Sequence, residues 1–481
     1  MRRATSSAPR RSGTSTEAQI PPARIALLLP YWSFWESAVP YSLREERGEL
    51  LDHAERALGG VHVVARATVA SREDGVAAAR AAEAAGAEAV LVLQTMAVPP
   101  AYTLAALEGL GRLPALVWAA HRQERLPASF DHAGITTEGA TVGTPMVTSM
   151  LVRSGRPFEL VVGRLDDPVT LERVSALARA AAAATRLARA RIGRVGRPPD
   201  GYGCVDAADA RLRATTGITL VSIEPAELRE LYAAVEPARV RELERETRSR
   251  YDVEAQGDGL QRSLRAACAL EDLVVRHRIA GGAMNCHVPE IRFGPEIGIA
   301  PCFGLGRLTS LGVPWSCAGD VLTAVAMLTA KLLGGAAQYH ELESLDYATG
   351  ELVVASSGEH DLAFGGGERP RLISNRWYTR DEHTGVCACF TAPAGPATLV
   401  GFAQLDAPWR YRLIAAAGEF TGRGWPSTGT PNAAFRFAAG AEGWERWCRA
   451  GVNHHSAATP GDLTGALITV ARFLGVEYVG V

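Results

Sequence analysis

The sequence has almost no excess charge of either sign and no long apolar run. Its 50 Lys and Arg residues nearly balance 52 Asp and Glu residues, which gives a formal net charge of -2. A chain with this balance has no overall positive field that would favour nucleic acid or an anionic membrane. No uninterrupted apolar stretch reaches the roughly 20 residues that a membrane-spanning helix needs. We therefore expect a soluble, cytoplasmic protein without nucleic-acid or membrane partners.

Cysteine is also scarce. Eight cysteines in 481 residues are too few for a disulfide scaffold. Cys387 and Cys389 are too closely spaced for the usual redox or zinc pair. Cys286, Cys302 and Cys317 lack the paired spacing of zinc ligands, so we expect them to be buried structural residues. The pattern is typical of a reduced, cytosolic interior.

The N-terminal residues lack an apolar segment. Residues 1–22 are rich in Arg, Ser, Thr and Pro, which argues against a secretory signal and predicts a disordered tail. The rest of the chain has the composition of a globular protein, with 47% hydrophobic and 21% charged residues overall. At roughly 100–200 residues per domain, its length allows two to four domains.

Short apolar runs alternate with helical stretches in the first part of the chain. The runs lie at 24–30, 61–69, 89–93, 115–119 and 158–162. This order is typical of a doubly wound parallel sheet, in which ligands bind at the loops after the strands. Residues 168–190 contain good helix formers throughout, with a Pro near the start, and predict a long helix crossing between two units.

A second α/β segment follows, and the pattern of apolar runs and turn residues then changes. Strands are expected at 191–195 and 217–223, and helices over 225–250 and 259–278. Past about residue 350, short apolar runs are punctuated by Gly, Pro, Asn and Asp, which predicts a mainly antiparallel β domain closed by a helix at 462–474. The predicted division is a disordered tail (1–22), an N-terminal Rossmann-like α/β domain (23–185), a central Rossmann-like α/β domain (186–345) and a C-terminal β-rich domain (346–481).

Two glycine-rich stretches are candidates for ligand-binding loops. Residues 191–206 could bring backbone amides close to a polar ligand but do not match the phosphate-loop pattern. The stretch from Gly304 to Thr309 begins like a dinucleotide fingerprint but has no βαβ frame, so a helix start or a tight turn is expected there.

Residues 281–361 hold an unusual number of polar groups among apolar ones, which costs free energy unless the polar groups bond or bind something. Asp320 immediately precedes an apolar helical stretch, so it is either the helix N-cap or a carboxylate at a pocket mouth. Glu341 follows that stretch, and Glu359 follows the apolar run at 351–355. The two glutamates lie near one another if the intervening turn is short.

Two adjacent histidines, His454 and His455, lie near the C-terminus. Neighbouring residues of one strand point to opposite faces, so only one of the two is expected to serve a given site. Surface or structural roles are the alternative for this pair.

The segment CAGDVLTAVAMLTAKLLGGAAQYHELESLD (317–346), the terminal GVNHH (451–455) and the order of elements resemble the L-arabinose isomerase and L-fucose isomerase superfamily. The resemblance implies two Rossmann-like domains followed by a β-rich domain. It also implies interconversion of aldoses and ketoses with a divalent metal, most often Mn²⁺, in a homo-oligomer.

The resemblance also implies metal ligands. Glu341 matches the acidic ligand after the helix, and His455 or His454 matches the late histidine. Ala318 stands where the family has a glutamate, and Ser356 falls where arabinose isomerases have a histidine, so two expected metal contacts are absent. The nearest candidates to replace them are Asp320 and the acidic and imidazole side chains of 359–361.

Three hypotheses follow from these residues. In the first, the protein is a metal-assisted sugar isomerase, in which Glu341 and His455 bind Mn²⁺ and Glu359 or Asp320 moves protons. In the second, it is a metal-independent epimerase or lyase, with Glu341 and Glu359 as an acid/base pair. In the third, it is a non-catalytic carbohydrate-binding protein that has kept the cleft and lost the chemistry.

Overall fold

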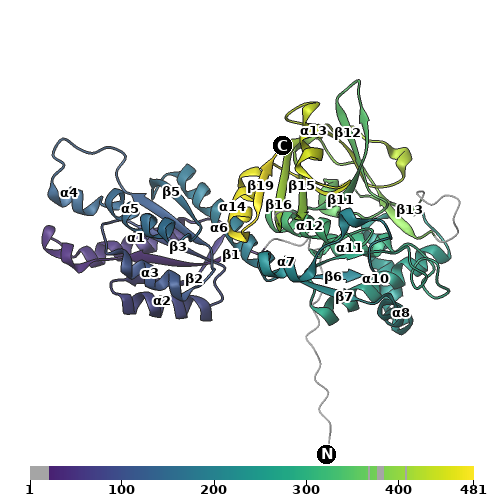
Figure 1. The fold of residues 1–481 in the computed structure, drawn as a ribbon, viewed down its shortest axis with the longest axis horizontal. Helices are drawn as coiled ribbons and strands as arrows, with labels where there is room; N and C mark the ends of the chain where they lie inside the picture. Colours follow the sequence, from purple (N-terminus) through teal and green to yellow (C-terminus); the bar gives the residue numbers. More distant parts are fainter. Residues whose placement is uncertain (1–20, 367–368, 376–383, 407–408) are drawn as a thin grey trace, which may run out of the picture.

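The computed structural model describes residues 21–366, 369–375, 384–406 and 409–481. It shows a mixed α/β fold with two parallel sheets and a C-terminal antiparallel β region that includes a closed barrel. In Figure 1 the first sheet lies on the left, and the second sheet and the barrel lie on the right. The predicted tail lies outside the described residues except for its last two positions. None of the described helices combines the length and the apolarity needed to cross a bilayer.

The first sheet has five parallel strands in the order β2-β1-β3-β4-β5. They are β1 (Ala23–Pro30), β2 (Val61–Val69), β3 (Ala89–Gln94), β4 (Ala115–His121) and β5 (Phe158–Arg164). Alternate residues of β1 pack to opposite sides, Ile25 and Leu27 with α1 and α6, and Ala26 and Leu28 with α2, α3 and α5. Both faces are therefore covered by helices, as the apolar runs predicted. These helices are α1 (Leu43–Ala57), α2 (Arg72–Ala84), α3 (Pro100–Gly109), α5 (Ala140–Arg153) and α6 (Pro168–Ala188); η1 (Ser33–Ala38) and α4 (His132–Thr137) lie in the connecting loops.

The second sheet has four parallel strands in the order β10-β9-β6-β7. They are β6 (Arg191–Val195), β7 (Thr219–Ile223), β9 (Gly281–Met284) and β10 (Trp315–Ser316). The associated helices are η2 (Gly203–Val205), α7 (Asp209–Thr216), α8 (Pro225–Ala234), α9 (Pro237–Arg250), α10 (Asp258–His277), α11 (Cys302–Ser310) and α12 (Val321–Gly334). The helical region expected over 225–250 consists of two helices, because Glu236 is held extended before Pro237, which begins α9.

Six antiparallel strands close into a barrel in the order β15-β18-β11-β12-β17-β16, with β15 pairing again with β16. They are β11 (Gln338–Asp346), β12 (Glu351–Ala355), β15 (Gly395–Asp406), β16 (Trp409–Phe420), β17 (Asn432–Phe437) and β18 (His455–Pro460), and β19 (Glu477–Gly480) adds to β16 in parallel. Because β11 starts at Gln338, the barrel begins before residue 346, where the β-rich domain was predicted to start. A small sheet of β8 (Asp252–Val253), β13 (Arg371–Ser374) and β14 (Val386–Cys389) lies beside it; η3 (Leu362–Gly365), η5 (Pro426–Thr428) and α13 (Glu442–Ala450) complete the region.

The long helix α6 connects the two halves of the molecule. Val174 and Ala178 pack in the core of the first sheet, whereas Ala180 and Ala184 pack with α12 and α14 (Thr464–Leu474). The small side chains of α6 let several elements approach it closely. Figure 1 shows α14, in yellow, between the first sheet and the barrel. The crossing helix predicted at 168–190 is therefore confirmed.

Candidate active site

The acidic and imidazole groups predicted to meet do meet. Glu341 on β11 is the direct antiparallel partner of His455 on β18. Residues directly opposite each other on two paired strands place their side chains on the same face of the sheet. The distance from His455 Nε2 to Glu341 Oε1 is 3.7 Å. The register of the barrel thus brings together two residues that are far apart in the sequence.

Asp320 is both a helix cap and a part of this cluster. Its Oδ1 accepts a hydrogen bond from Thr323 N at 2.8 Å, and its Oδ2 accepts one from Thr323 Oγ1 at 2.8 Å, so it is the N-cap of α12. Oδ2 also lies 3.0 Å from His455 Nδ1 and 3.0 Å from Asn453 Nδ2. A carboxylate accepts hydrogen bonds, so it selects the tautomer with the proton on Nδ1 and leaves Nε2 facing Glu341.

Glu341 is held by two hydroxyl groups. Tyr339 donates to Glu341 Oε1 at 3.1 Å, and Ser357 donates to the same oxygen at 3.2 Å. The Glu341 side chain is 19% exposed, so a ligand can reach its carboxylate from solvent. Neither hydroxyl was predicted from the sequence. Tyr339 could have been found from the period of two along a strand, because it shares a face with Glu341.

Glu359 is a buried carboxyl beside this cluster. It is 1% exposed, and neither carboxylate oxygen has a hydrogen-bond partner among the described residues. Burial, and to a smaller extent the charge of Glu341, raises the pKa of Glu359, while a backbone hydrogen bond and the nearby Cys317 and Cys302 thiols lower it, and the net pKa is about 7. These two cysteines and Cys286 are buried and free, as predicted. Glu359 can therefore hold or release a proton near neutral pH.

Buried contacts fix the backbone around Glu359. Its carbonyl oxygen accepts hydrogen bonds from Gln338 Nε2 at 2.8 Å and from Ser356 Oγ at 2.7 Å. The hydroxyl of Ser356 is thus used within the turn. Two residues on, Asp361 forms a buried ion pair with Lys331, with Nζ 2.6 Å from Oδ2. The position of Glu359 follows from this network.

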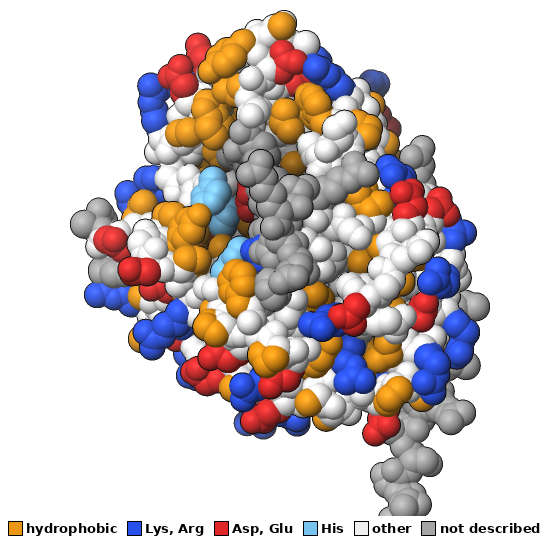
Figure 2. Space-filling view, turned by 90° about the vertical axis from the view of Figure 1, so that its right-hand side faces the viewer, with side chains coloured by type: hydrophobic (Ala, Val, Ile, Leu, Met, Phe, Trp, Pro, Cys, Tyr) orange, Lys and Arg blue, Asp and Glu red, His pale blue; other side chains and the backbone are white. Residues whose placement is uncertain are grey.

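The two adjacent histidines do not diverge as we expected. Their ring centroids are 3.8 Å apart. His455 is the first residue of β18, so His454 precedes the strand and escapes its alternation. His455 is buried and bonded to Asp320, whereas His454 is exposed. Figure 2 shows histidine surface near the middle of one face of the molecule, with most charged side chains spread around it.

The glycine-rich loop after β6 packs against the site. Arg197 O accepts a hydrogen bond from Asn285 Nδ2 at 2.8 Å, and Cys204 O accepts one from Asn453 Nδ2 at 3.3 Å. Gly319 has a φ of +73°, and a Cβ there would lie 3.1 Å from Pro198 N. The site therefore lies where the carboxyl ends of β6, β9 and β10 meet the barrel, as expected for parallel strands.

The second glycine-rich stretch lies in α11, which begins at Cys302, as the alternative of a helix start predicted. Gly306 is required by packing, because a Cβ at this position would lie 2.1 Å from His360 Nδ1. His360 contacts Tyr251 through Nε2, 2.8 Å from the phenolic oxygen. This stretch is therefore part of the packed core.

The donor set does not fit the predicted Mn²⁺ ion. Among the residues that the structure describes, no three His, Cys, Asp or Glu side chains form a group that could hold a metal ion. Glu341 and His455 offer two ligands. The oxygens of Asp320 already accept the hydrogen bonds described above, and Ala318 supplies only a methyl group.

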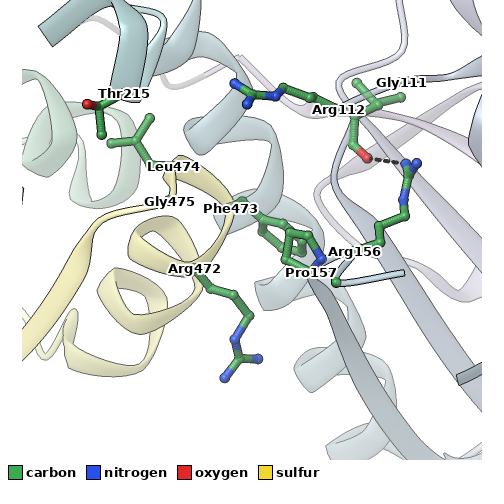
Figure 3. Close-up of a pocket in the computed structure, with 11 residues that line it drawn as sticks. Gly111, Arg112, Arg156, Pro157, Thr215, Arg472, Phe473, Leu474 and Gly475 are labelled. Carbon is green, nitrogen blue, oxygen red and sulfur yellow. Dashed lines mark hydrogen bonds between the residues drawn. The ribbon is translucent and has the colours of Figure 1, made fainter. Parts of the chain in front are cut away.

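A cavity of about 360 Å³ lies away from this cluster, between the first sheet and α14. Figure 3 shows Arg112, Arg156 and Arg472 around it. Arg156 donates to Leu107 O at 2.8 Å and to Leu113 O at 3.0 Å, so it satisfies carbonyl groups at and beyond the end of α3. The cavity adjoins the amino ends of β4 and β5, opposite the loops where parallel sheets bind ligands. We interpret it as a seam between packed units.

A scan against protein-family models and a search of curated proteins both find no match to this chain.

Proposed function

We propose that this chain is an isomerase that moves a proton between adjacent carbons of a sugar-sized hydroxycarbonyl compound. The observation that carries the proposal is the row Asp320–His455–Glu341, whose members are 3.0 Å and 3.7 Å apart and lie beside the buried, protonatable Glu359. The three-domain division at 185 and 345 and the sugar-isomerase resemblance belong to the same proposal. The resemblance alone supports a cytoplasmic homo-oligomer, which size-exclusion chromatography with light scattering would test.

The reaction needs a base and an acid at neighbouring positions. A base removes the proton from the carbon next to the carbonyl while an acid protonates the carbonyl oxygen, which gives an enediol. The carbon-bound proton then returns to the former carbonyl carbon, and the hydroxyl of the other carbon loses its proton and becomes the new carbonyl. Atoms and electrons balance without an external reductant.

The side chains of the site can divide these tasks. Glu341, held by two hydroxyl donors, is the carboxylate that removes and returns the carbon-bound proton. Glu359, whose pKa is about 7, is partly protonated at neutral pH and donates to the carbonyl oxygen. His455, with Nδ1 directed at Asp320, presents Nε2 to accept the hydroxyl proton.

Among the described residues a metal ion would find two protein ligands here, Glu341 and His455, so the proposed steps rest on the side chains alone. This donor set favours the metal-independent branch of our sequence-based hypotheses over the Mn²⁺ enzyme. We expect full activity from EDTA-treated protein that metal analysis shows to be free of metal. A loss of activity that added Mn²⁺ reverses would contradict this expectation. An epimerase would use the same groups but return the proton to the same carbon.

The direct test is exchange of carbon-bound hydrogen with solvent. We would incubate the protein in D₂O with a panel of pentoses, hexoses and deoxysugars and follow deuterium incorporation by NMR. We expect exchange with wild type and a loss of about 100-fold or more with Glu341→Gln, the range for a lost acid/base group. Glu442→Gln, on the surface helix α13, is the matched control and should retain the wild-type rate.

Each outcome separates the hypotheses. An unchanged rate in Glu341→Gln would refute the role of this carboxylate. Saturable sugar binding without exchange across the panel would favour a carbohydrate-binding protein. Exchange without a new ketose or aldose, but with inversion at one carbon, would identify an epimerase, and cleavage of the carbon skeleton or loss of water would identify a lyase.

A further inference from the structure

The side chain of Asn453 joins three separate parts of the candidate active site. Its Oδ1 accepts a hydrogen bond from the backbone N–H of His455 at 2.5 Å, and its Nδ2 donates to Asp320 Oδ2 at 3.0 Å. Nδ2 also donates to Cys204 O at 3.3 Å, in the glycine-rich loop after β6. One amide therefore contacts the start of β18, the N-cap of α12 and the loop.

These partners leave one orientation for the amide. The backbone N–H of His455 needs an acceptor, whereas Asp320 Oδ2 and Cys204 O need donors. If the amide were turned over, its oxygen would face two other oxygens and its NH₂ group would face an N–H. Oδ2 of Asp320 therefore receives the amide of Asn453 together with Nδ1 of His455.

The backbone that carries Asn453 is itself held in place. Helix α13 ends at Ala450, and Gly451 follows it with a φ of +95°. Val452 packs against β15 so closely that a Cβ at Gly401 would lie 2.7 Å from its side chain. Because its backbone is fixed, the short Asn453 side chain can set the positions of its partners.

The contacts of Asn453 support the hydrogen bond that orients His455. Asp320 is fully buried, and its Oδ2 orients the imidazole through Nδ1. Without the amide, Thr323 would still hold Asp320 on α12, but the carboxylate would lose its hydrogen bond to the segment that precedes β18. A displacement of about 1 Å in a reacting group can lower the rate on the order of 100-fold.

We infer that Asn453 is a positioning residue, which aligns the Asp320 carboxylate with the His455 ring and ties both to the glycine-rich loop. This inference rests on the proposed function and adds a residue that acts through others. The alignment of His455 matters when it accepts a proton, which is during the reaction and not during binding. Loss of the amide should therefore lower kcat and leave KM unchanged.

The experiment compares Asn453→Ala, Asn453→Asp and the control Gln404→Ala. Asn453→Asp keeps the size of the side chain and the acceptor for His455 N, but it replaces the NH₂ donor with a second oxygen. Gln404, on β15, is a matched amide, because its Oε1 accepts a hydrogen bond from Ala208 N at 3.2 Å, just past the same loop. Its hydrogen bonds to the described residues involve neither Asp320 nor His455.

The first readout is solvent deuterium exchange into L-arabinose, L-fucose and D-xylose, which gives kcat and KM. The second readout is the Nδ1–H resonance of His455 in protein labelled with nitrogen-15 histidine, assigned by its loss in His455→Gln. We expect both Asn453 variants to lose about 10- to 100-fold in kcat at unchanged KM and to show a shifted or broadened His455 resonance. Gln404→Ala should retain the wild-type kcat and resonance.

The outcomes separate this inference from the proposed function. If wild type turns over a probe and the Asn453 variants retain its kcat, the inference is refuted and the enzyme assignment stands. A loss confined to Asn453→Ala would also refute it, because the donor to Asp320 would be dispensable, and so would an equal loss in Gln404→Ala. If wild type converts no probe, the enzyme assignment fails and the resonance decides: a change in both Asn453 variants supports the alignment, and an unchanged resonance refutes it.

Discussion

Replacing Glu359 with glutamine should change how the stability of the protein depends on pH. Burial raises the pKa of this carboxyl from 4.5 to about 7 in the folded chain. Between these two values the folded state holds a proton that the unfolded state has released, so the free energy of unfolding falls as pH rises through this window. At about 1.4 kcal/mol per pH unit, the total loss is about 3 kcal/mol by neutral pH. Glutamine does not ionise, so Glu359→Gln should lack this loss.

The assay is urea unfolding followed by tryptophan fluorescence, from about pH 4.5 to about pH 8. The difference in unfolding free energy between Glu359→Gln and wild type cancels the titration of all other groups. It should shift in favour of the variant by about 3 kcal/mol across the window and then level off. Glu49→Gln, at an exposed position of α1, is the matched control and should show no such trend. If the unfolding free energies of wild type and Glu359→Gln change with pH in parallel, burial does not raise the pKa of this carboxyl. Its proposed role as an acid near neutral pH would then be refuted.

Two further substitutions test the packing that positions the site. Lys331→Met should destabilise the protein by about 3–5 kcal/mol in urea unfolding, because it leaves the buried Asp361 carboxylate without its ion-pair partner. Adding Asp361→Asn to Lys331→Met should restore part of the lost stability. A loss below about 1 kcal/mol in Lys331→Met alone would refute the ion pair. Gly306→Ala should cost about 1–3 kcal/mol in the same assay, because the new methyl group meets the His360 ring. If the urea midpoint of Gly306→Ala equals that of wild type, the His360 ring can move aside.

The strands and helices were predictable because their signals are local. The apolar runs at 24–30 and 191–195 became β1 and β6, and the long helix was read from residues 168–190. Burial on both faces of a parallel sheet produces continuous apolar runs that need no tertiary information. The division of 225–250 was missed although its signal, Pro237, is also local.

The candidate site was predictable only in its membership. Glu341, Asp320 and His455 were found from residue types and a resemblance, but their contact depends on the register between β11 and β18. A shift of one residue would turn the His455 ring to the other face of the sheet, and no local pattern fixes this register. Ser357 was missed for the same reason, because its contact with Glu341 depends on the turn after β12.

The environment of Glu359 depends on still more distant parts of the chain. Cys302 begins α11 and Cys317 follows β10, so the thiols beside this carboxyl come from elements that precede it by many residues. A glutamate followed by His360 and Asp361 reads in the sequence as a polar turn. Only the packing of the folded chain removes water from around the Glu359 carboxyl, and this burial is the largest cause of its raised pKa.

Asp320 shows why stability and chemistry are coupled in this site. Its Oδ1 accepts a hydrogen bond from the backbone N–H of Thr323 at the start of α12, and its Oδ2 accepts one from Nδ1 of His455. One carboxylate therefore caps the helix and orients the imidazole. The cap fixes the carboxylate on a rigid, fully buried helix end, which in turn fixes the ring that it bonds. The direction of His455 Nε2 toward Glu341 therefore depends on the start of α12 remaining in place. A substitution that frays this helix end would release the imidazole, even though it touches neither His455 nor Glu341.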